Sequence, residues 1–230
     1  KTKKYTMNLN NQKKIKKKNL KNSEDFILSK LGPEIYEKFY KNYTIKQWGM
    51  SPKKLSKNIA GRVPIRLNRN PYYVNEKMKF MPKNGFTQMF KKMIKDKKIR
   101  VLLNTDFFKI RNKIKYNKFL IYTGTPDKFF NYKYGKLDWR SLIFKFKTFK
   151  KSYIQNSVQY NFPNDYKFTR KVEIKHVTKQ KTPFTVISKE FPTNQGDPYY
   201  PIINNKNLIK FSKYKKLIDK LENKNIYFEG

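Results

Sequence analysis

Hydrophobic and polar positions follow two different periods along the chain. From Asn22 to about residue 40, after Gly85, and over residues 206–222, apolar side chains recur at the spacing of a helix face. Asn22 and Ser23 precede two acidic residues, which is typical of a helix start, and Gly32-Pro33 is expected to break the first stretch into two helices. The first part of the chain is therefore predicted to be helical.

The second part of the chain favours strands. Residues 142–147 alternate between apolar and polar side chains, which indicates a strand with one wet face. Short helices are expected after Ser51-Pro52 and over residues 127–130, and residues 57–75 are expected to form a long loop. The remaining predicted strands are Ile99–Leu103, Phe107–Ile110, Phe119–Tyr122, Val158–Phe162, Phe168–Ile174, Phe184–Phe191 and Ile226–Phe228. The predicted class is mixed α/β, a helical part followed by an antiparallel sheet.

Composition excludes several classes of protein. The 230 residues contain no Cys, so there is neither a disulfide framework nor a thiolate metal site, and no other metal site is predicted. No apolar run is long enough to span a bilayer, and no signal peptide is visible.

The formal net charge of +39 is explained most simply by an AT-rich genome, because Lys and Asn are abundant while Ala60 is the only Ala. A surface selected for polyanions is the alternative; otherwise nucleic-acid binding should be weak and non-specific. Under such drift a retained Arg is the more informative cation, since only its planar fork binds bidentately. The seven are Arg62, Arg66, Arg69, Arg100, Arg111, Arg140 and Arg170.

Three segments could carry chemistry. Tyr43 and Trp48 could stack on a base or a sugar ring, or be core aromatics at a helix end. The cationic loop Gly61–Arg69 could clamp a diphosphate, or simply be solvated. The two Tyr residues of Asp197–Ile202 are held between prolines, or lie in an ordinary turn. The single His, His176, is interpreted as structural, and no carboxylate pair stands out as a general acid and base.

Eight segments, in order, closely resemble the bacterial UDP-galactopyranose mutase family over residues 22–230. They are Phe39-Tyr-x-x-Tyr-Thr-x-Lys-Gln-Trp48, Gly61-Arg-Val-Pro-Ile-Arg66, Met81-Pro-Lys-Asn-Gly-Phe86, Leu103-Asn-Thr-Asp-Phe-Phe108, Tyr122-Thr-Gly-x-x-Asp127-x-Phe-Phe130, Leu137-x-x-Arg-Ser-Leu142, Phe168-Thr-Arg170 and Pro198-Tyr-Tyr-Pro201. The resemblance implies interconversion of UDP-galactopyranose and UDP-galactofuranose, with reduced FAD attacking the anomeric carbon as UDP leaves. The protein then supplies position and charge.

The resemblance also implies the roles of individual residues. The implied catalytic residues are Arg62 and Arg170, and flavin contacts are implied for Thr123 and Gly124. The implied substrate-binding residues are Asn8, Phe39, Tyr40, Tyr43, Thr44, Trp48, Tyr73, Tyr199 and Tyr200.

The implied architecture is a helical substrate-binding part and an antiparallel sheet, attached to an incomplete FAD-binding Rossmann-like domain. Its expected parts are residues 1–80 with a mobile loop near 53–70, residues 81–132 as part of the FAD domain, the sheet over residues 133–204, and residues 205–230 returning to the FAD domain.

The family's Gly-rich FAD fingerprint is absent, so we interpret the chain as a fragment that is inactive alone and binds FAD poorly. We expect a cytoplasmic enzyme without a membrane span or a specific nucleic-acid partner, and keep a homodimer as a candidate assembly. The alternatives are a basic polyanion-binding module, or an amine-oxidase-like FAD oxidoreductase.

Overall fold

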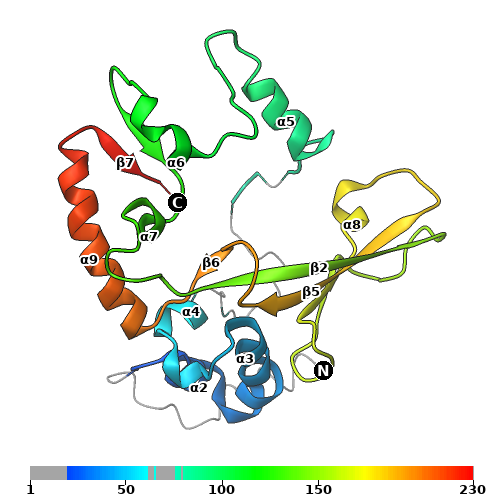
Figure 1. Ribbon diagram of the computed structural model, residues 1–230. Helices are drawn as coiled ribbons and strands as arrows, with labels where there is room; N and C mark the ends of the chain where they lie inside the picture. The colour runs from blue at the N-terminus through cyan, green and yellow to red at the C-terminus, as the bar shows by residue number, and fades with distance from the viewer. Residues whose placement is uncertain (1–19, 62–64, 66–75, 79, 230) are drawn as a thin grey trace. The chain divides into compact units, whose positions relative to one another are not determined.

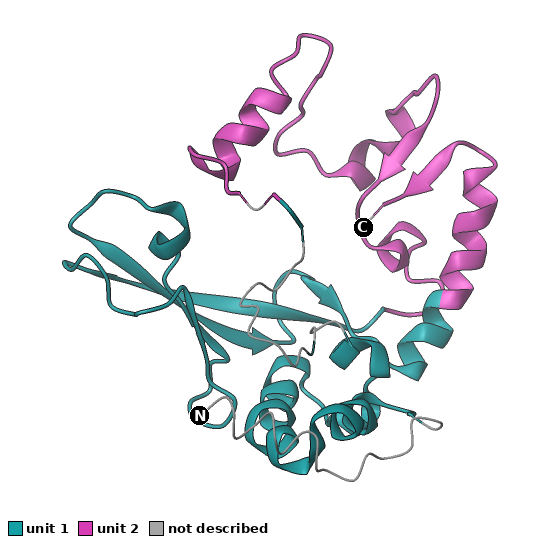
Figure 2. Ribbon diagram, turned by 180° about the vertical axis from the view of Figure 1, so that it is seen from behind, with its two compact units in different colours: residues 1–77, 137–211 teal, residues 78–136, 212–230 magenta. Residues whose placement is uncertain are grey.

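The computed structural model describes residues 20–61, 65, 76–78 and 80–229, and the structural statements below refer to these residues. The chain forms two compact units (Figure 2). Unit 1 comprises residues 1–77 and 137–211, and unit 2 comprises residues 78–136 and 212–230. Each unit is described separately.

From residue 20 onward, unit 1 contains a run of helices (Figure 1). The helix α2 (Ser23–Ile35) is capped by Asn22, whose side-chain oxygen accepts a hydrogen bond from the Asp25 amide at 2.9 Å. Gly32 leaves the helical conformation with a φ of 75°, which confirms the predicted break before Pro33. The chain continues as the π-helix η2 (Tyr36–Lys41), α3 (Asn42–Trp48), the short 3-10 helix η3 (Pro52–Lys54) and α4 (Lys57–Gly61).

Two buried clusters hold these helices. Ile27, Leu31 and Tyr36 pack together along α2 and η2. Trp48, Leu55, Ile59 and Ile202 form the second cluster, which ties the end of α3 to the segment that follows the sheet. The expectation of a loop from residue 57 is wrong at its start, because burial of Ile59 in this cluster favours the short helix α4.

A five-stranded sheet with strand order β3-β4-β5-β2-β6 forms the rest of unit 1, and all its neighbours are antiparallel. Two long strands, β2 (Trp139–Phe149) and β5 (Thr185–Thr193), lie side by side at its centre (Figure 1). The others are β3 (Gln159–Asn161), β4 (Arg170–Val172) and β6 (Tyr200–Pro201), and α8 (Lys175–Thr178) follows β4. Helices with an antiparallel sheet confirm the mixed α/β class.

Unit 2 pairs two short strands, β1 (Leu120–Tyr122) and β7 (Ile226–Phe228), in parallel. Its helices are α5 (Gly85–Met93), α6 (Phe107–Ile110), the 3-10 helix η4 (Arg111–Lys113), α7 (Pro126–Phe129) and the part of α9 (Asn205–Glu222) from residue 212. The helices predicted after Gly85, after Pro126 and over residues 206–222 are therefore confirmed. Its membership of a Rossmann-like domain stays a prediction.

Two predicted strands of unit 2 are wrong. Residues 99–103 form no regular element, and residues 107–110 form α6. The helix starts there because the Asp106 carboxylate accepts a hydrogen bond from the Phe108 amide at 2.8 Å, and the Phe107 ring contacts Tyr122 and Phe129. Within the described ranges, no helix is both long and apolar enough to cross a membrane.

Candidate functional site

The aromatic segment that precedes the sheet is built on η2 and α3. π-Helical turns are rare in proteins, and those that occur are often found at functional sites. The π-helix η2 carries Phe39 and Tyr40. Phe39 is 48 % exposed, whereas Tyr40, Tyr43 and Thr44 are half-buried. Burial raises the pKa of the Tyr40 hydroxyl, which therefore stays protonated at neutral pH. This segment presents aromatic rings and hydroxyl groups from neighbouring turns.

Arg170 forms the centre of the polar cluster in unit 1. Its Nε donates to the Tyr43 hydroxyl at 2.9 Å, and its Nη1 lies 3.4 Å from Glu190 Oε2. Burial by itself would lower the pKa of Arg170, but Tyr43 and Glu190 outweigh it and raise that pKa. The guanidinium is therefore a fixed positive charge, held between α3 and the sheet.

Tyr200 approaches the same cluster from β6. Its hydroxyl accepts a hydrogen bond from Gln47 Nε2 at 2.6 Å and donates to the Gln47 backbone oxygen at 3.0 Å. Its ring meets Trp48 edge-on, with centroids 5.1 Å apart. Burial raises the pKa of the Tyr200 hydroxyl, while Arg140, Gln47 and Arg170 oppose the increase. Tyr43, Trp48, Arg170 and Tyr200 are thus brought into one cluster.

Arg140 is an anchoring residue that had no role assigned from the sequence. It is 5 % exposed, and its Nε and Nη2 donate to the backbone oxygens of Gln47 and Lys46, each at 3.1 Å. Its Nη1 donates to the Asn194 side chain. The scarcity of Arg drew attention to it as one of seven, without separating it from the others. The positive charge of Arg140 at the carboxyl end of α3 also interacts favourably with the helix dipole.

Gly49 is required where Arg140 meets α3. It has a φ of 68°, and a Cβ added there would lie 2.9 Å from Arg140 Nη1. A left-handed residue ends α3, and only glycine leaves space for the guanidinium. The segment around Trp48 is therefore fixed by backbone geometry as well as by packing.

The tip of the β3–β4 hairpin supports α3 from another side. Lys46 Nζ donates to the backbone oxygens of Phe162 and Asp165, both at 2.7 Å. Desolvation lowers the pKa of Lys46, although Asp165 opposes that effect. Asn42 and Asn164 add a side-chain hydrogen bond at 3.0 Å. These contacts fix Tyr43 relative to the strand that carries Arg170.

Other sequence-predicted residues lie elsewhere. Asn8, Arg62 and Tyr73 lie outside the described residues. Tyr199 is 53 % exposed and contacts the Phe144 ring, with centroids 6.3 Å apart, rather than the polar cluster. In this structure Tyr200 is the member of the pair that joins Gln47.

Thr123 and Gly124 belong to unit 2, where both are exposed after β1. The carboxyl end of a parallel strand is where dinucleotides bind in open α/β sheets. A Cβ on Gly124 would lie only 2.4 Å from the Tyr122 hydroxyl, so a neighbouring side chain occupies the space beside this glycine. The one-turn helix α7 begins just after them, but this segment supplies a single glycine and not the glycine-rich turn that an FAD pyrophosphate needs.

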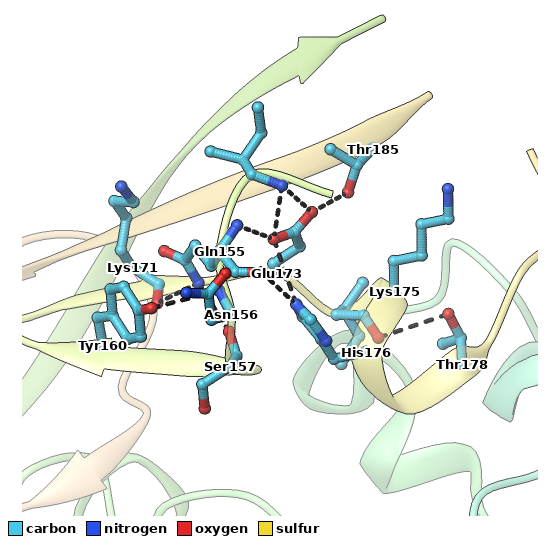
Figure 3. A network of polar contacts seen from close by, with 12 residues as sticks. Gln155, Asn156, Ser157, Tyr160, Lys171, Glu173, Lys175, His176, Thr178 and Thr185 are labelled. Atoms are coloured by element: carbon cyan, nitrogen blue, oxygen red, sulfur yellow. Dashed lines mark hydrogen bonds and ion pairs between the residues drawn. The ribbon is translucent and has the colours of Figure 1, made fainter. Parts of the chain in front are cut away.

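A second polar network surrounds Glu173 (Figure 3). This fully buried carboxylate accepts hydrogen bonds from the Ile154 and Gln155 amides and from the Thr185 hydroxyl. Desolvation would raise the pKa of Glu173, but these donors and His176 lower it. His176 Nε2 lies 2.9 Å from the Gln155 backbone oxygen and 3.5 Å from Glu173. The network joins the loop at residues 154–155 to β5, so Glu173 and His176 have a structural role.

Comparison with known sequences assigns the chain to a family. The sequence profile described as UDP-galactopyranose mutase matches residues 38–230. A probable UDP-galactopyranose mutase of Klebsiella pneumoniae is 34 % identical over 211 residues, covering 90 % of this chain and 54 % of the relative. A UDP-galactopyranose mutase of Mycoplasma genitalium is 33 % identical over 218 residues, covering 86 % of this chain and 53 % of the relative.

A more distant relative is the dTDP-fucopyranose mutase of Escherichia coli, 28 % identical over 188 residues, which cover 78 % of this chain and 50 % of that protein. The chain spans about half the length of the curated relatives it matches. The profile nevertheless covers most of the chain and includes the α3 segment and Arg170. The chain belongs to the UDP-galactopyranose mutase family.

Proposed function

We propose that this chain supplies the nucleotide-sugar-binding part of an isomerase that interconverts UDP-galactopyranose and UDP-galactofuranose. The observation that carries the proposal is the Arg170 guanidinium, held by Tyr43 and Glu190 beside Tyr200. A fixed cation among aromatic rings and hydroxyl groups suits a ligand that combines a diphosphate with planar and polyhydroxylated parts. The family membership supports UDP-galactose as that ligand.

The proposed roles follow the order of the segments. Phe39, Tyr40, Tyr43 and Thr44 hold the uridine end, and Trp48 faces the sugar-phosphate. Arg170 acts next to the sugar. Tyr200, with Tyr199, hydrogen-bonds the diphosphate, and its hydroxyl proton then leaves the Gln47 backbone oxygen to which it donates in this structure. Arg62, Tyr73 and Asn8 are proposed to complete the site.

Electrostatics gives Arg170 its catalytic role. When UDP leaves the anomeric carbon, negative charge increases on the departing diphosphate. A preorganised guanidinium in a partly desolvated site stabilises that charge more in the transition state than in the ground state. Since Tyr43 and Glu190 already hold Arg170, little reorganisation is needed when the charge develops.

The proposal includes reduced FAD as the cofactor, cytoplasmic location and homodimer formation as a candidate assembly. Because Thr123 and Gly124 do not make a dinucleotide site by themselves, no catalytic step is assigned to the described residues of unit 2. Neither a polyanion-binding module nor an amine-oxidase-like oxidoreductase is favoured by the family match.

Titration with UDP and with UDP-galactose tests the binding part of the proposal. Both tryptophans of the sequence, Trp48 and Trp139, lie in unit 1, so their fluorescence reports on this unit. We expect saturable binding that Arg170→Ala weakens by about tenfold or more, the value of one charge-assisted hydrogen bond. Arg100→Ala, at an exposed arginine of unit 2, is the matched control.

The absence of binding to both ligands at millimolar concentration would contradict the proposed ligand class. A titration with dTDP shows whether the base is discriminated. The reaction itself is tested with the full-length enzyme and FAD reduced by dithionite. Chromatography then measures the conversion of UDP-galactofuranose to UDP-galactopyranose. An inactive whole-gene product that still binds UDP-galactose would refute the isomerase reaction alone.

A further inference from the structure

Two buried acceptor atoms in the polar cluster of unit 1 have no hydrogen-bond donor among the described residues. They are Gln47 Oε1 and Glu190 Oε2, and both residues are only 8 % exposed. A buried acceptor without a donor costs about 1–3 kcal/mol, and more when it is charged. Gln155 Oε1 and Ser188 Oγ, elsewhere in unit 1, also lack a hydrogen-bond partner within the described ranges, so a missing donor alone does not indicate a ligand. The place of Gln47 and Glu190 beside Tyr200 and Arg170 is what points to one.

The position of Glu190 points toward the ligand side of the cluster. Arg170 and Glu190 are direct partners across β4 and β5, and Glu190 is in turn the partner of Phe144 on β2. Directly opposed residues share one face of a sheet. The carboxylate therefore lies on the same face as the proposed catalytic guanidinium.

The contact between the two charges leaves capacity for another donor. Glu190 Oε2 lies 3.4 Å from Arg170 Nη1, beyond the usual 2.7–2.9 Å of a charge-assisted hydrogen bond. An ionised carboxylate oxygen has two lone pairs, so it can accept from a ligand while it balances the guanidinium. An arginine and a carboxylate held in this way offer one donor group and one acceptor group side by side.

Gln47 presents its oxygen for a related reason. Its amide nitrogen donates to the Tyr200 hydroxyl, and the hydroxyl proton of Tyr200 is already used on the Gln47 backbone oxygen. Only the amide nitrogen, and not Oε1, can therefore pair with Tyr200. The remaining oxygen needs a donor from outside this pair.

Both oxygens can only accept hydrogen bonds, which restricts the chemistry of the ligand. At neutral pH a diphosphate has almost no donors and would be repelled by Glu190, whereas each sugar hydroxyl carries one proton to donate. We propose that Glu190 accepts a hydrogen bond from a hydroxyl of the hexose and determines specificity for it, and that Gln47 accepts from another hydroxyl of the same ligand. This inference rests on the proposed nucleotide-sugar function and assigns its hexose subsite.

The test compares UDP with UDP-galactose in the wild type, Glu190→Gln and Glu190→Leu. The ratio of the Kd for UDP-galactose to the Kd for UDP isolates the hexose. Because a hydrogen bond to a charged group contributes about tenfold or more in affinity, we expect this ratio to rise about tenfold in both variants. The Kd for UDP in the same variants reports separately on the Arg170 guanidinium, which Glu190 contacts. Glu34→Gln removes an exposed carboxylate of unit 1 and is the charge-matched control.

A second measurement needs no substitution in the protein. Analogues of UDP-galactose in which one hexose hydroxyl is replaced by fluorine cannot donate at that position. We expect at least one analogue to bind the wild type about tenfold more weakly than UDP-galactose binds it. The same analogue should bind Glu190→Leu as tightly as UDP-galactose binds that variant.

An unchanged Kd ratio in both variants would overturn the assignment, as would equal binding of all the fluorinated analogues, which would leave ordered water as the donor. In either case UDP binding would persist, so the proposed function would stand while the hexose subsite fails. Absence of binding to both UDP and UDP-galactose in the wild type would refute both.

Discussion

Truncation of Arg140 should destabilise unit 1 strongly, because one buried guanidinium holds three acceptors. It donates to the Lys46 and Gln47 backbone oxygens, each at 3.1 Å, and to the Asn194 side chain. Each hydrogen bond from a charged donor contributes about 1.5–3 kcal/mol, but bonds that share one group are not additive. Arg140→Ala leaves three neutral acceptors without this donor, and each one that stays buried costs about 1–3 kcal/mol, so we expect a total loss of about 3–5 kcal/mol.

Urea unfolding followed by tryptophan fluorescence measures this loss in the relevant unit, since Trp48 and Trp139 both belong to unit 1. A loss of about 3–5 kcal/mol corresponds to a decrease of roughly 6–20 °C in Tm for a chain of this size. Arg140→Lys keeps the charge but not the planar fork, so its stability should lie between those of the wild type and Arg140→Ala. Arg100→Ala, at an exposed arginine, should stay within about 0.5 kcal/mol.

A loss below about 1 kcal/mol for Arg140→Ala, with an unchanged denaturant dependence, would refute the clamp. The result would mean that water replaces the guanidinium at the end of α3 at little cost. A shift in the fluorescence maximum of Trp48 without a loss of stability would point the same way.

Three further predictions concern the other groups described above. Hydrogen-bond donors outweigh desolvation and hold the pKa of Glu173 below its ordinary value of 4.5. The ionised carboxylate therefore stabilises the fold fully above pH 4.5, and this stabilisation is lost as the pH falls through the folded-state pKa. In urea melts Glu173→Gln should be less stable than the wild type at pH 7, and the difference should shrink toward pH 3. A difference that is independent of pH would contradict this. Gly49→Ala should lose about 1–2 kcal/mol in the same melts, because its φ is 68° and the new Cβ would meet a guanidinium nitrogen at 2.9 Å; an unchanged midpoint would show that the guanidinium moves aside. In the catalytically competent enzyme with reduced flavin, Arg62→Ala and Arg170→Ala should each lower kcat/KM about a hundredfold or more in steady-state kinetics, and Arg62→Lys should restore it only in part; near-normal activity of the two alanine variants would mean that the wrong arginines were assigned.

Local sequence signals determined most of the secondary structure. The Asn22 cap and the Gly32-Pro33 break act within a few residues, so they could be recognised without a fold. The alternation over residues 142–147 and the apolar spacing over residues 206–222 likewise specified β2 and α9. Errors arose where apolar runs were short, as in residues 107–110, because a strand and a buried helical turn then share one pattern.

The family was also within reach of the sequence, since eight ordered segments carried it and the profile match over residues 38–230 agrees. Composition contributed a weaker signal. Two of the arginines in the described part of the chain, Arg140 and Arg170, proved to be anchored in the polar cluster, whereas Arg100 is exposed. Scarcity alone could not separate these cases.

Only the tertiary structure decided which side chains meet. Tyr43 and Arg170 are 127 residues apart in the sequence, and Gln47 and Tyr200 are 153 residues apart. Glu190 carries no local motif, and it gains its place beside Arg170 from the register of β4 against β5. Cross-strand register and helix docking are non-local, so they depend on packing energies that no short segment contains. For that reason the unpaired acceptors of the cluster became visible only in the folded chain.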